Sequence, residues 1–223
     1  MNISLSAGGN IQTLHPFYAT NDYFNHDREA GVVHLKTNTR GVHVTEDFIV
    51  GLQKGLEEEV GDAAGMVMYR AGYEWGLQDM KEFEIRFERE FGGRTKMNEA
   101  NIMFVLEQWW WPLTAEGWGT WSVDFSNRKQ GLIFVDVYDS AVAKSLGAIG
   151  KPVCHMYAGL LAGVFTYFSK RELSGIEIQC YGMGETYCKF LLGAQDRIDA
   201  AAFWMNEGAT ARDIEKRLRS GDQ

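Results

Sequence analysis

The last third of the chain contains four residues whose side chains are strong metal ligands. They are Cys154, Cys180 and Cys188, with Glu177 three positions before the second cysteine. Zinc accepts thiolate sulfur and carboxylate oxygen in a tetrahedral arrangement, and His155, next to the first cysteine, is a competing ligand. Cysteine is also a small apolar residue that is often buried and inert. Because the chain has no CxxC pair, the residue types alone leave both interpretations open.

A predicted strand that holds Glu177 sets a geometric condition on such a site. Side chains alternate between the two faces of a regular strand, so Glu177 and Cys180 would point in opposite directions. We therefore expect the strand to bulge or to end between them. Gly182 and Gly184 provide the backbone freedom for a tight return, and this return brings Cys188 back towards Cys180.

Aromatic residues are the second feature of chemical interest, because the chain has 7 Trp and an aromatic share of 13%. Three indoles follow one another at positions 109–111 and cannot all face one side of a helix. At least one must lie near solvent, a pocket mouth or a partner. Core and interface packing is one interpretation, and a ligand pocket is the other. The candidate pocket residues are Trp109, Trp110, Trp118, Trp121, Tyr157, Tyr167 and Phe168.

The apolar periodicity predicts the elements that must position these residues. Period-3.6 patterns predict helices and period-2 patterns predict strands. Helices, a hairpin, helices, a second hairpin and helices follow in that order, which is typical of an α+β fold with an antiparallel sheet of hairpins packed with several helices. Helices are expected near 45–60, 62–91, 98–111, 140–147, 153–170, 196–206 and 210–219, and strands near 31–35, 118–125, 131–138, 175–180 and 187–192.

Three details of the helical segments are specific enough to test. Phe48, Ile49, Leu52 and Leu56 have the spacing of one buried helix face, with Thr45 as N-cap, and Pro112 should stop the helix that precedes it. Glycines at 65, 72 and 76 let another helix approach the long helix 62–91 closely. Such a stripe fits a tightly packed bundle or a symmetric dimer face. We expect this helix to lie at the face of a homodimer.

Composition and charge limit the classes of function. With 22 Lys+Arg against 30 Asp+Glu, the net charge is -8, which disfavours nucleic acid and anionic lipid as partners. No apolar run is long enough for a membrane span and no signal peptide is evident, so we predict a cytoplasmic protein. The odd number of cysteines argues against a disulfide framework. The length of 223 residues fits an N-terminal arm at 1–40 and one domain at 41–223.

The run IEIQCYGMGETYCKFLLG resembles the signature of the 4-vinyl reductase-type domain family. That family includes bacteriochlorophyll-biosynthesis-associated vinyl reductase-like proteins, cyanobacterial relatives and the sensory domains of aromatic-responsive activators. In the sensory members a zinc is held by Cys, Glu, Cys and Cys, and Cys154, Glu177, Cys180 and Cys188 match this order with steps of 23, 3 and 8. The resemblance is sharp over 151–193, and it implies that these four residues hold a structural Zn(II) in a C-terminal lobe.

The resemblance also implies what surrounds such a metal. Four protein ligands leave no open position for substrate, so the zinc would stabilise the fold without acting as a Lewis acid. Lys189, or backbone N–H groups at 182–186, would offset the negative charge of the site as outer-shell groups. In phenol-sensing relatives a His and a Trp contact the ligand hydroxyl, whereas here no His lies between His43 and His155.

Taken together, the residues and the resemblance predict a zinc-stabilised homodimeric binding protein for a hydrophobic small molecule. A tetrapyrrole, either a chlorophyll precursor or a bilin, is the first candidate, with a carrier or assembly role in pigment or photosystem biogenesis. One alternative is a stand-alone sensor of small aromatic compounds that signals to a protein partner. A second is a vinyl reductase acting with an external reductant, although no dinucleotide fingerprint or iron–sulfur cysteine cluster is present.

Overall fold

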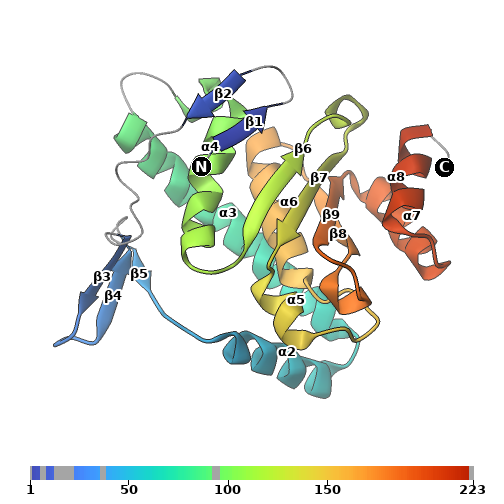
Figure 1. Ribbon diagram of the computed structural model, residues 1–223, viewed down its shortest axis with the longest axis horizontal. Helices are drawn as coiled ribbons and strands as arrows, with labels where there is room; N and C mark the ends of the chain where they lie inside the picture. The colour runs from blue at the N-terminus through green and yellow to red at the C-terminus, as the bar shows by residue number, and fades with distance from the viewer. Residues whose placement is uncertain (1, 6–8, 13–22, 36–38, 92–95, 221–223) are drawn as a thin grey trace.

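The computed structural model describes residues 2–5, 9–12, 23–35, 39–91 and 96–220. Its centre is a four-stranded antiparallel sheet with the spatial order β6-β7-β9-β8 (Figure 1). Two hairpins build this sheet and meet where β7 pairs with β9. This is the predicted α+β architecture. The strands are β6 (Thr120–Asp124), β7 (Ile133–Tyr138), β8 (Ser174–Gln179) and β9 (Cys188–Gly193).

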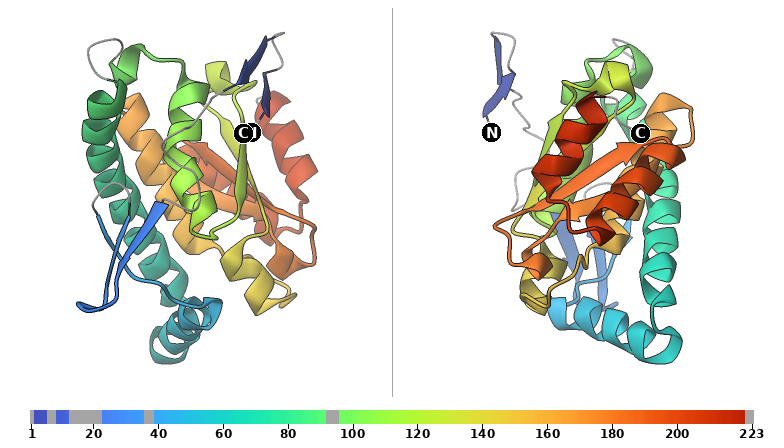
Figure 2. Two further views of the ribbon diagram at one scale, coloured as in Figure 1. Left: turned by 60° about the vertical axis from the view of Figure 1, so that its left-hand side comes forward. Right: turned by 90° about the vertical axis from the view of Figure 1, so that its right-hand side faces the viewer.

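Helices cover both faces of the sheet, as Figure 2 shows. On one face lie α3 (Ala63–Phe91), α4 (Ile102–Ala115) and α6 (His155–Ser169), and on the other lie α7 (Gln195–Asn206) and α8 (Ala211–Ser220). The alternation of side chains along β7 explains the two cores. Val135 and Val137 point into the larger core under α3, α4 and α6. Phe134 points into the smaller core under α7 and α8.

The predicted glycine stripe has a partner within the same chain. Gly72 and Gly76 of α3 face Gly159 and Gly163 of α6, and the two helices run side by side. A Cβ built on Gly72 would lie 2.0 Å from the carbonyl oxygen of Met156, and one built on Gly159 would lie 1.9 Å from a carbonyl oxygen of α3. The stripe therefore serves close helix packing inside the domain. The dimer face that we inferred from it is not supported, because another helix already occupies the surface.

Two predicted details of the helices are wrong. α4 does not stop before Pro112 but continues through this buried residue to Ala115. The backbone N–H of Glu116 donates to the Pro112 oxygen at 2.9 Å, and that of Trp118 donates to the Leu113 oxygen at 2.9 Å. These bonds, together with the burial of Pro112 and Leu113, hold the last turn despite the missing proline N–H.

The second difference concerns α2 (Glu46–Val60), which packs against α3 and the short α5 (Ala141–Leu146). The predicted buried face is only partly buried, because Phe48 is 58% exposed and Leu52 is 47% exposed. Ile49 packs on the core and Gln53 is buried. The helix therefore lies at the rim of the domain and contacts it along a narrow stripe.

The N-terminal part contains short antiparallel strands. β1 (Asn2–Leu5) pairs with β2 (Gly9–Gln12), and β3 (Phe24–Asp27), β4 (Val32–Leu35) and β5 (Arg40–Gly41) form a small sheet that projects from the domain (Figure 1). The strand expected near 31–35 is β4. Three short 3-10 turns complete the described structure, at Met97–Glu99, Arg128–Gln130 and Tyr181–Met183.

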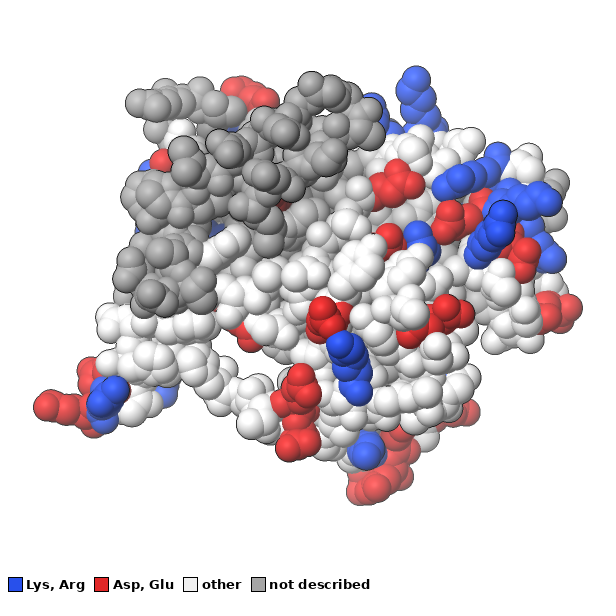
Figure 3. Space-filling model, in the orientation of Figure 1, with Lys and Arg blue, Asp and Glu red and all other residues white. Residues whose placement is uncertain are grey.

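The surface is divided by charge on the face that Figure 3 shows. Lys and Arg gather over α8, and Asp and Glu gather over α2. Within the described residues, no helix combines the length and the hydropathy needed to cross a bilayer.

Candidate functional site

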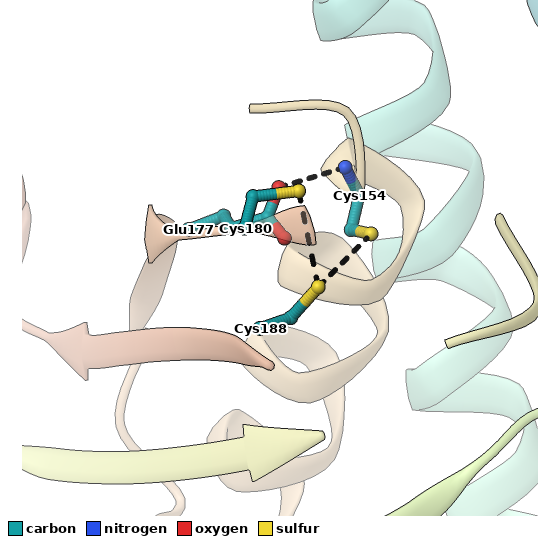
Figure 4. A group of neighbouring side chains, drawn as sticks. All are labelled: Cys154, Glu177, Cys180 and Cys188. Carbon is teal, nitrogen blue, oxygen red and sulfur yellow. Dashed lines mark hydrogen bonds between the residues drawn. The ribbon is translucent and has the colours of Figure 1, made fainter. Parts of the chain in front are cut away.

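The four predicted metal ligands converge at one end of the sheet. Cys154 caps the N-terminus of α6, Glu177 lies on β8, Cys180 follows the end of β8, and Cys188 begins β9. One potential ligand atom from each residue lies within 4.8 Å of the others, and all four residues are buried (Figure 4). The fold thus gathers side chains that are up to 34 residues apart in the chain.

The backbone meets the geometric condition set by the strand. The pairing of β8 with β9 shifts register between Glu177 and Gln179, and β8 ends at Gln179. This irregularity turns Glu177 and Cys180 towards the same point, as predicted. A 3-10 turn follows and ends at Gly184, whose φ of 89° favours glycine. It returns the chain so that Cys188 lies beside Cys180.

The spacing of the sulfur atoms fits a tetrahedral zinc. Cys188 Sγ lies 3.8 Å from Cys154 Sγ and 3.8 Å from Cys180 Sγ. Zinc–sulfur bonds of about 2.3 Å in a tetrahedron place neighbouring sulfur atoms about 3.8 Å apart. No disulfide is formed by these cysteines. The thiols therefore already have the separation that one shared ion requires.

The two carboxylate oxygens of Glu177 have different surroundings. Oε2 accepts hydrogen bonds from the backbone N–H groups of Val153 at 3.0 Å and Cys154 at 2.8 Å. Oε1 is buried and has no hydrogen-bond partner among the described residues. Because an unpaired buried oxygen is costly, this atom is the natural fourth ligand of a cation held by the three sulfurs.

Electrostatics point the same way. Burial, together with the charge of Cys180, raises the pKa of Glu177 well above its ordinary value. Burial also raises the pKa of Cys154, and hydrogen bonds with Cys180 and Cys188 add to the shift. Several acidic groups in one buried space cannot all ionise without a compensating cation. The residues present thus fit Zn(II), which would neutralise most of their charge when bound.

Backbone groups, and not a lysine, provide the nearby positive charge. The N–H of Gly182 donates to Cys180 Sγ at 3.2 Å, and the N-terminus of α6 points at Glu177 through its first amides. Lys189 contacts Asp136 at 3.1 Å and Glu215 at 3.3 Å. Its side chain is directed away from the cluster because neighbouring residues of β9 alternate between faces, so the predicted role of Lys189 is wrong.

His155 is not in the cluster either. The cluster of potential ligands among the described residues comprises only the three cysteines and Glu177. The His155 ring instead faces α3, where its Nε2 would lie 3.1 Å from a Cβ built on Gly65. The competing-ligand interpretation is therefore not supported by the geometry.

The seven aromatic residues of the candidate pocket do not line one common space. Trp110, Trp121 and Tyr157 are buried in the larger core. Tyr167 hydrogen-bonds to Glu84 on α3 and, with Phe168, is half-buried. Trp109 and Trp118 border two neighbouring clefts. The pocket assignment therefore stays a prediction only for these two tryptophans.

The first of these clefts, here called the α3–α4 cleft, has a volume of about 410 Å³. The second, the arm cleft, has a volume of about 590 Å³ and lies between the β3–β5 sheet, the start of α2 and the end of α4. Leu35 and Glu116 border both clefts. His43 lies in the arm cleft with Trp118, and its position in the arm gave no sequence signal for this role.

Charged residues in the α3–α4 cleft were also missed from the sequence. Asp79, Arg86 and Glu116 line this space beside Trp75 and Trp109. The available signal was the presence of Asp79 and Arg86 on the same face of α3 as the buried Phe83, since charged residues on a buried helix face are unusual. Periodicity alone could not show that α4 and the arm close the space over them.

Comparisons with known proteins support the predicted resemblance. Residues 133–194 match the family model of the 4-vinyl reductase-type domain. An uncharacterised protein of Methanocaldococcus jannaschii, MJ1642, is 36% identical over 58 residues, which cover 26% of this chain and 36% of the relative. The match thus spans about a third of that relative's length.

Two solved structures align with this chain. The phenol-responsive sensory domain of the transcription activator PoxR, solved with phenol, aligns with a TM-score of 0.63 at 18% identity over 84% of this chain and 92% of that one. A vinyl-4-reductase family protein from Methanocaldococcus jannaschii aligns with a TM-score of 0.42 at 16% identity, over 65% of this chain and 75% of that one. The resemblance predicted from the Cys–Glu–Cys–Cys spacing is confirmed, and residues 133–194 belong to the 4-vinyl reductase-type domain family.

Proposed function

We propose that this protein binds a small aromatic molecule and that a structural Zn(II), held by Cys154, Glu177, Cys180 and Cys188, stabilises its fold. The observation that carries the binding function is the pair of tryptophan-bordered clefts of about 410 and 590 Å³, which lie in the size range of small-molecule sites. A protein of the same fold, the PoxR sensory domain, was solved with phenol. This likeness supports the proposal and does not identify the ligand.

The metal has a purely structural role in this proposal. Three thiolates and one carboxylate complete a four-coordinate site, so no position remains for water or substrate. The site joins the start of α6 to β8 and β9. The alternative of a vinyl reductase gains no support from these residues and stays a prediction.

Single aromatic rings suit the clefts better than a tetrapyrrole. Leu35 and Glu116 border both spaces, so a broad planar macrocycle would have to displace them to use the combined volume. Polar groups also reach into each cleft, including Asp79 in the first and His43 in the second. The tetrapyrrole carrier, the homodimer and the role in pigment or photosystem biogenesis remain predictions.

A titration followed by Trp fluorescence and absorption tests this function. Zinc-loaded protein is titrated separately with phenol, benzoate, benzylamine and protoporphyrin IX. Saturable quenching by at least one single-ring compound is expected, because Trp75, Trp109 and Trp118 border the clefts. A saturable, shifted pigment band with no response to the smaller compounds would favour the tetrapyrrole carrier. No saturable response to any of the four would contradict ligand binding.

A further inference from the structure

Charges of opposite sign are separated along the α3–α4 cleft. α3 and α4 pass each other so that Asp79 lies beside Trp109 and, further along, Phe87 lies beside Phe104. Asp79 and Arg86 are seven residues apart, which is about 10 Å along a helix axis. Glu116 lies at the Asp79 end, because its neighbour Trp118 contacts Trp75. The cleft thus has a carboxylate end and a guanidinium end.

The carboxylate end is partly occupied by donors from the protein. Trp109 Nε1 donates to Asp79 Oδ2 at 2.6 Å, and the Tyr23 hydroxyl donates to Glu116 Oε1 at 2.9 Å. Burial raises the pKa of both carboxyl groups, and each is further destabilised by a neighbouring carboxylate. Each carboxylate oxygen accepts more than one hydrogen bond, so these groups can still bind an ammonium group.

The guanidinium end has unused donors. Arg86 makes no ion pair within 4.0 Å of a carboxylate in the described part of the chain, and its Nε is buried without a hydrogen-bond partner. Its guanidinium lies over the Phe83 ring at 5.0 Å, which limits its motion. A planar guanidinium held in this way is suited to a carboxylate. Arg89 borders the same end.

The middle of the cleft is suited to an aromatic ring. Trp75, Phe83 and Trp109 border it between the two ends. Glu82 lies at the exposed rim and already accepts a hydrogen bond from Gln78 at 3.1 Å. It therefore competes less for a ligand than the carboxylates deeper in the cleft.

From this arrangement we infer that the α3–α4 cleft binds an aromatic molecule with an ammonium group at one end and a carboxylate at the other. The ammonium group contacts Asp79 and Glu116, the ring lies against Trp75 and Trp109, and the carboxylate pairs with Arg86. This inference rests on the proposed binding function and names the ligand chemistry for one of its two clefts.

Calorimetric titration of the zinc-loaded full chain with four size-matched probes tests the inference. The probes are 4-(aminomethyl)benzoate, which carries both charges, 4-methylbenzylamine, 4-methylbenzoate and the neutral 4-methylbenzyl alcohol. We expect the doubly charged probe to bind at least tenfold more tightly than each of the others. Equal affinity for all four would overturn the charge assignment and leave the binding function standing, whereas no binding of any probe would contradict both.

Two variants locate the charges within the cleft. Arg86→Gln should remove the preference for the doubly charged probe over 4-methylbenzylamine, and Asp79→Asn should remove its preference over 4-methylbenzoate. Arg70→Gln and Glu74→Gln, at exposed positions of the same helix outside the cleft, serve as matched controls and should bind as the unmodified protein does. Unchanged preferences in both cleft variants, with thermal midpoints showing that they are folded, would overturn the inference.

Discussion

Glu177 shows how one side chain prepares the candidate zinc site. Its Oε2 is held by two backbone amides, while Oε1 is buried without a partner among the described residues. The amides fix the orientation of the carboxylate before any metal binds, which is the role of outer-shell hydrogen bonds in metal sites. Sulfur separations of 3.8 Å complete this preorganisation.

Replacing one ligand should remove the metal. We expect Cys188→Ser to lower bound zinc from one ion per chain to a small fraction, measured by elemental analysis of tag-free protein, and to lower the thermal midpoint. The free energy of structural zinc binding, on the order of 10 kcal/mol, contributes directly to folding. The control is Ile178→Val, because Ile178 is buried in the other core. A folded Cys188→Ser protein with full stability would contradict a structural role for the metal.

Asp79 should weaken the fold at neutral pH. Its folded-state pKa is raised, mainly by burial, so the folded state binds the proton more tightly than the unfolded state and stability falls as pH rises through this window. Asp79→Asn keeps an acceptor for Trp109 Nε1 and removes the charge. We expect the variant to have a higher thermal midpoint than the unmodified protein at pH 7, and the difference to vanish below about pH 4, where the carboxyl group is protonated in both states. A lower midpoint at pH 7 would contradict this expectation.

At the scale of elements, the contact between α3 and α6 decides how closely the layers pack. Four glycines let the backbones approach until no Cβ fits between them. α6 carries Cys154 at its N-terminus, and α3 carries Asp79 and Arg86 in the neighbouring cleft. The same helix pair therefore positions both the candidate metal site and the candidate ligand site.

A methyl group in this contact should be strongly destabilising. A Cβ on Gly159 would lie 1.9 Å from the Tyr69 carbonyl oxygen, and neither backbone can move easily. We expect Gly159→Ala to lower the free energy of unfolding by about 3 kcal/mol or more, as overpacking does in tightly packed cores. Gly51→Ala in α2, where a Cβ meets nothing within 4 Å, should instead stabilise by up to about 1 kcal/mol. Urea unfolding measures both, and similar effects would contradict the packing argument.

At the scale of the whole molecule, the metal site and the clefts use different parts of the chain. The four metal ligands lie within residues 154–188. The clefts depend on N-terminal residues, including Tyr23 and Leu35 in the α3–α4 cleft and His43 in the arm cleft. The arm predicted at 1–40 thus contributes walls to the proposed binding sites, while the domain boundary itself stays a prediction.

Removing the arm should separate the two properties. We expect residues 45–223 to bind one zinc per chain and to lose at least tenfold in affinity for any ligand found with the full chain, because the outer walls of both clefts are gone. Elemental analysis and calorimetry measure the two effects. Full-length Leu35→Ala, which opens one shared wall, should show an intermediate loss. Unchanged affinity in residues 45–223 would place the ligand elsewhere.

Local patterns in the sequence determined the order of elements, the two hairpins and the metal-ligand set. Side-chain alternation required the irregularity between Glu177 and Cys180, and the register shift in β8 is that irregularity. The resemblance named the four ligands from their spacing. These features follow from residues close in the chain, where the backbone geometry allows few arrangements.

Only the tertiary structure decided which surfaces meet. It paired the α3 glycines with Gly159 and Gly163 instead of a second copy, extended α4 through Pro112, and left Phe48 exposed. It also set Asp79 and Arg86 into a cleft that α4 and the arm close. Each outcome depends on contacts between distant segments, whose packing free energies can override local propensity. A periodic pattern shows that a helix has a face, and the packed chain determines what covers it.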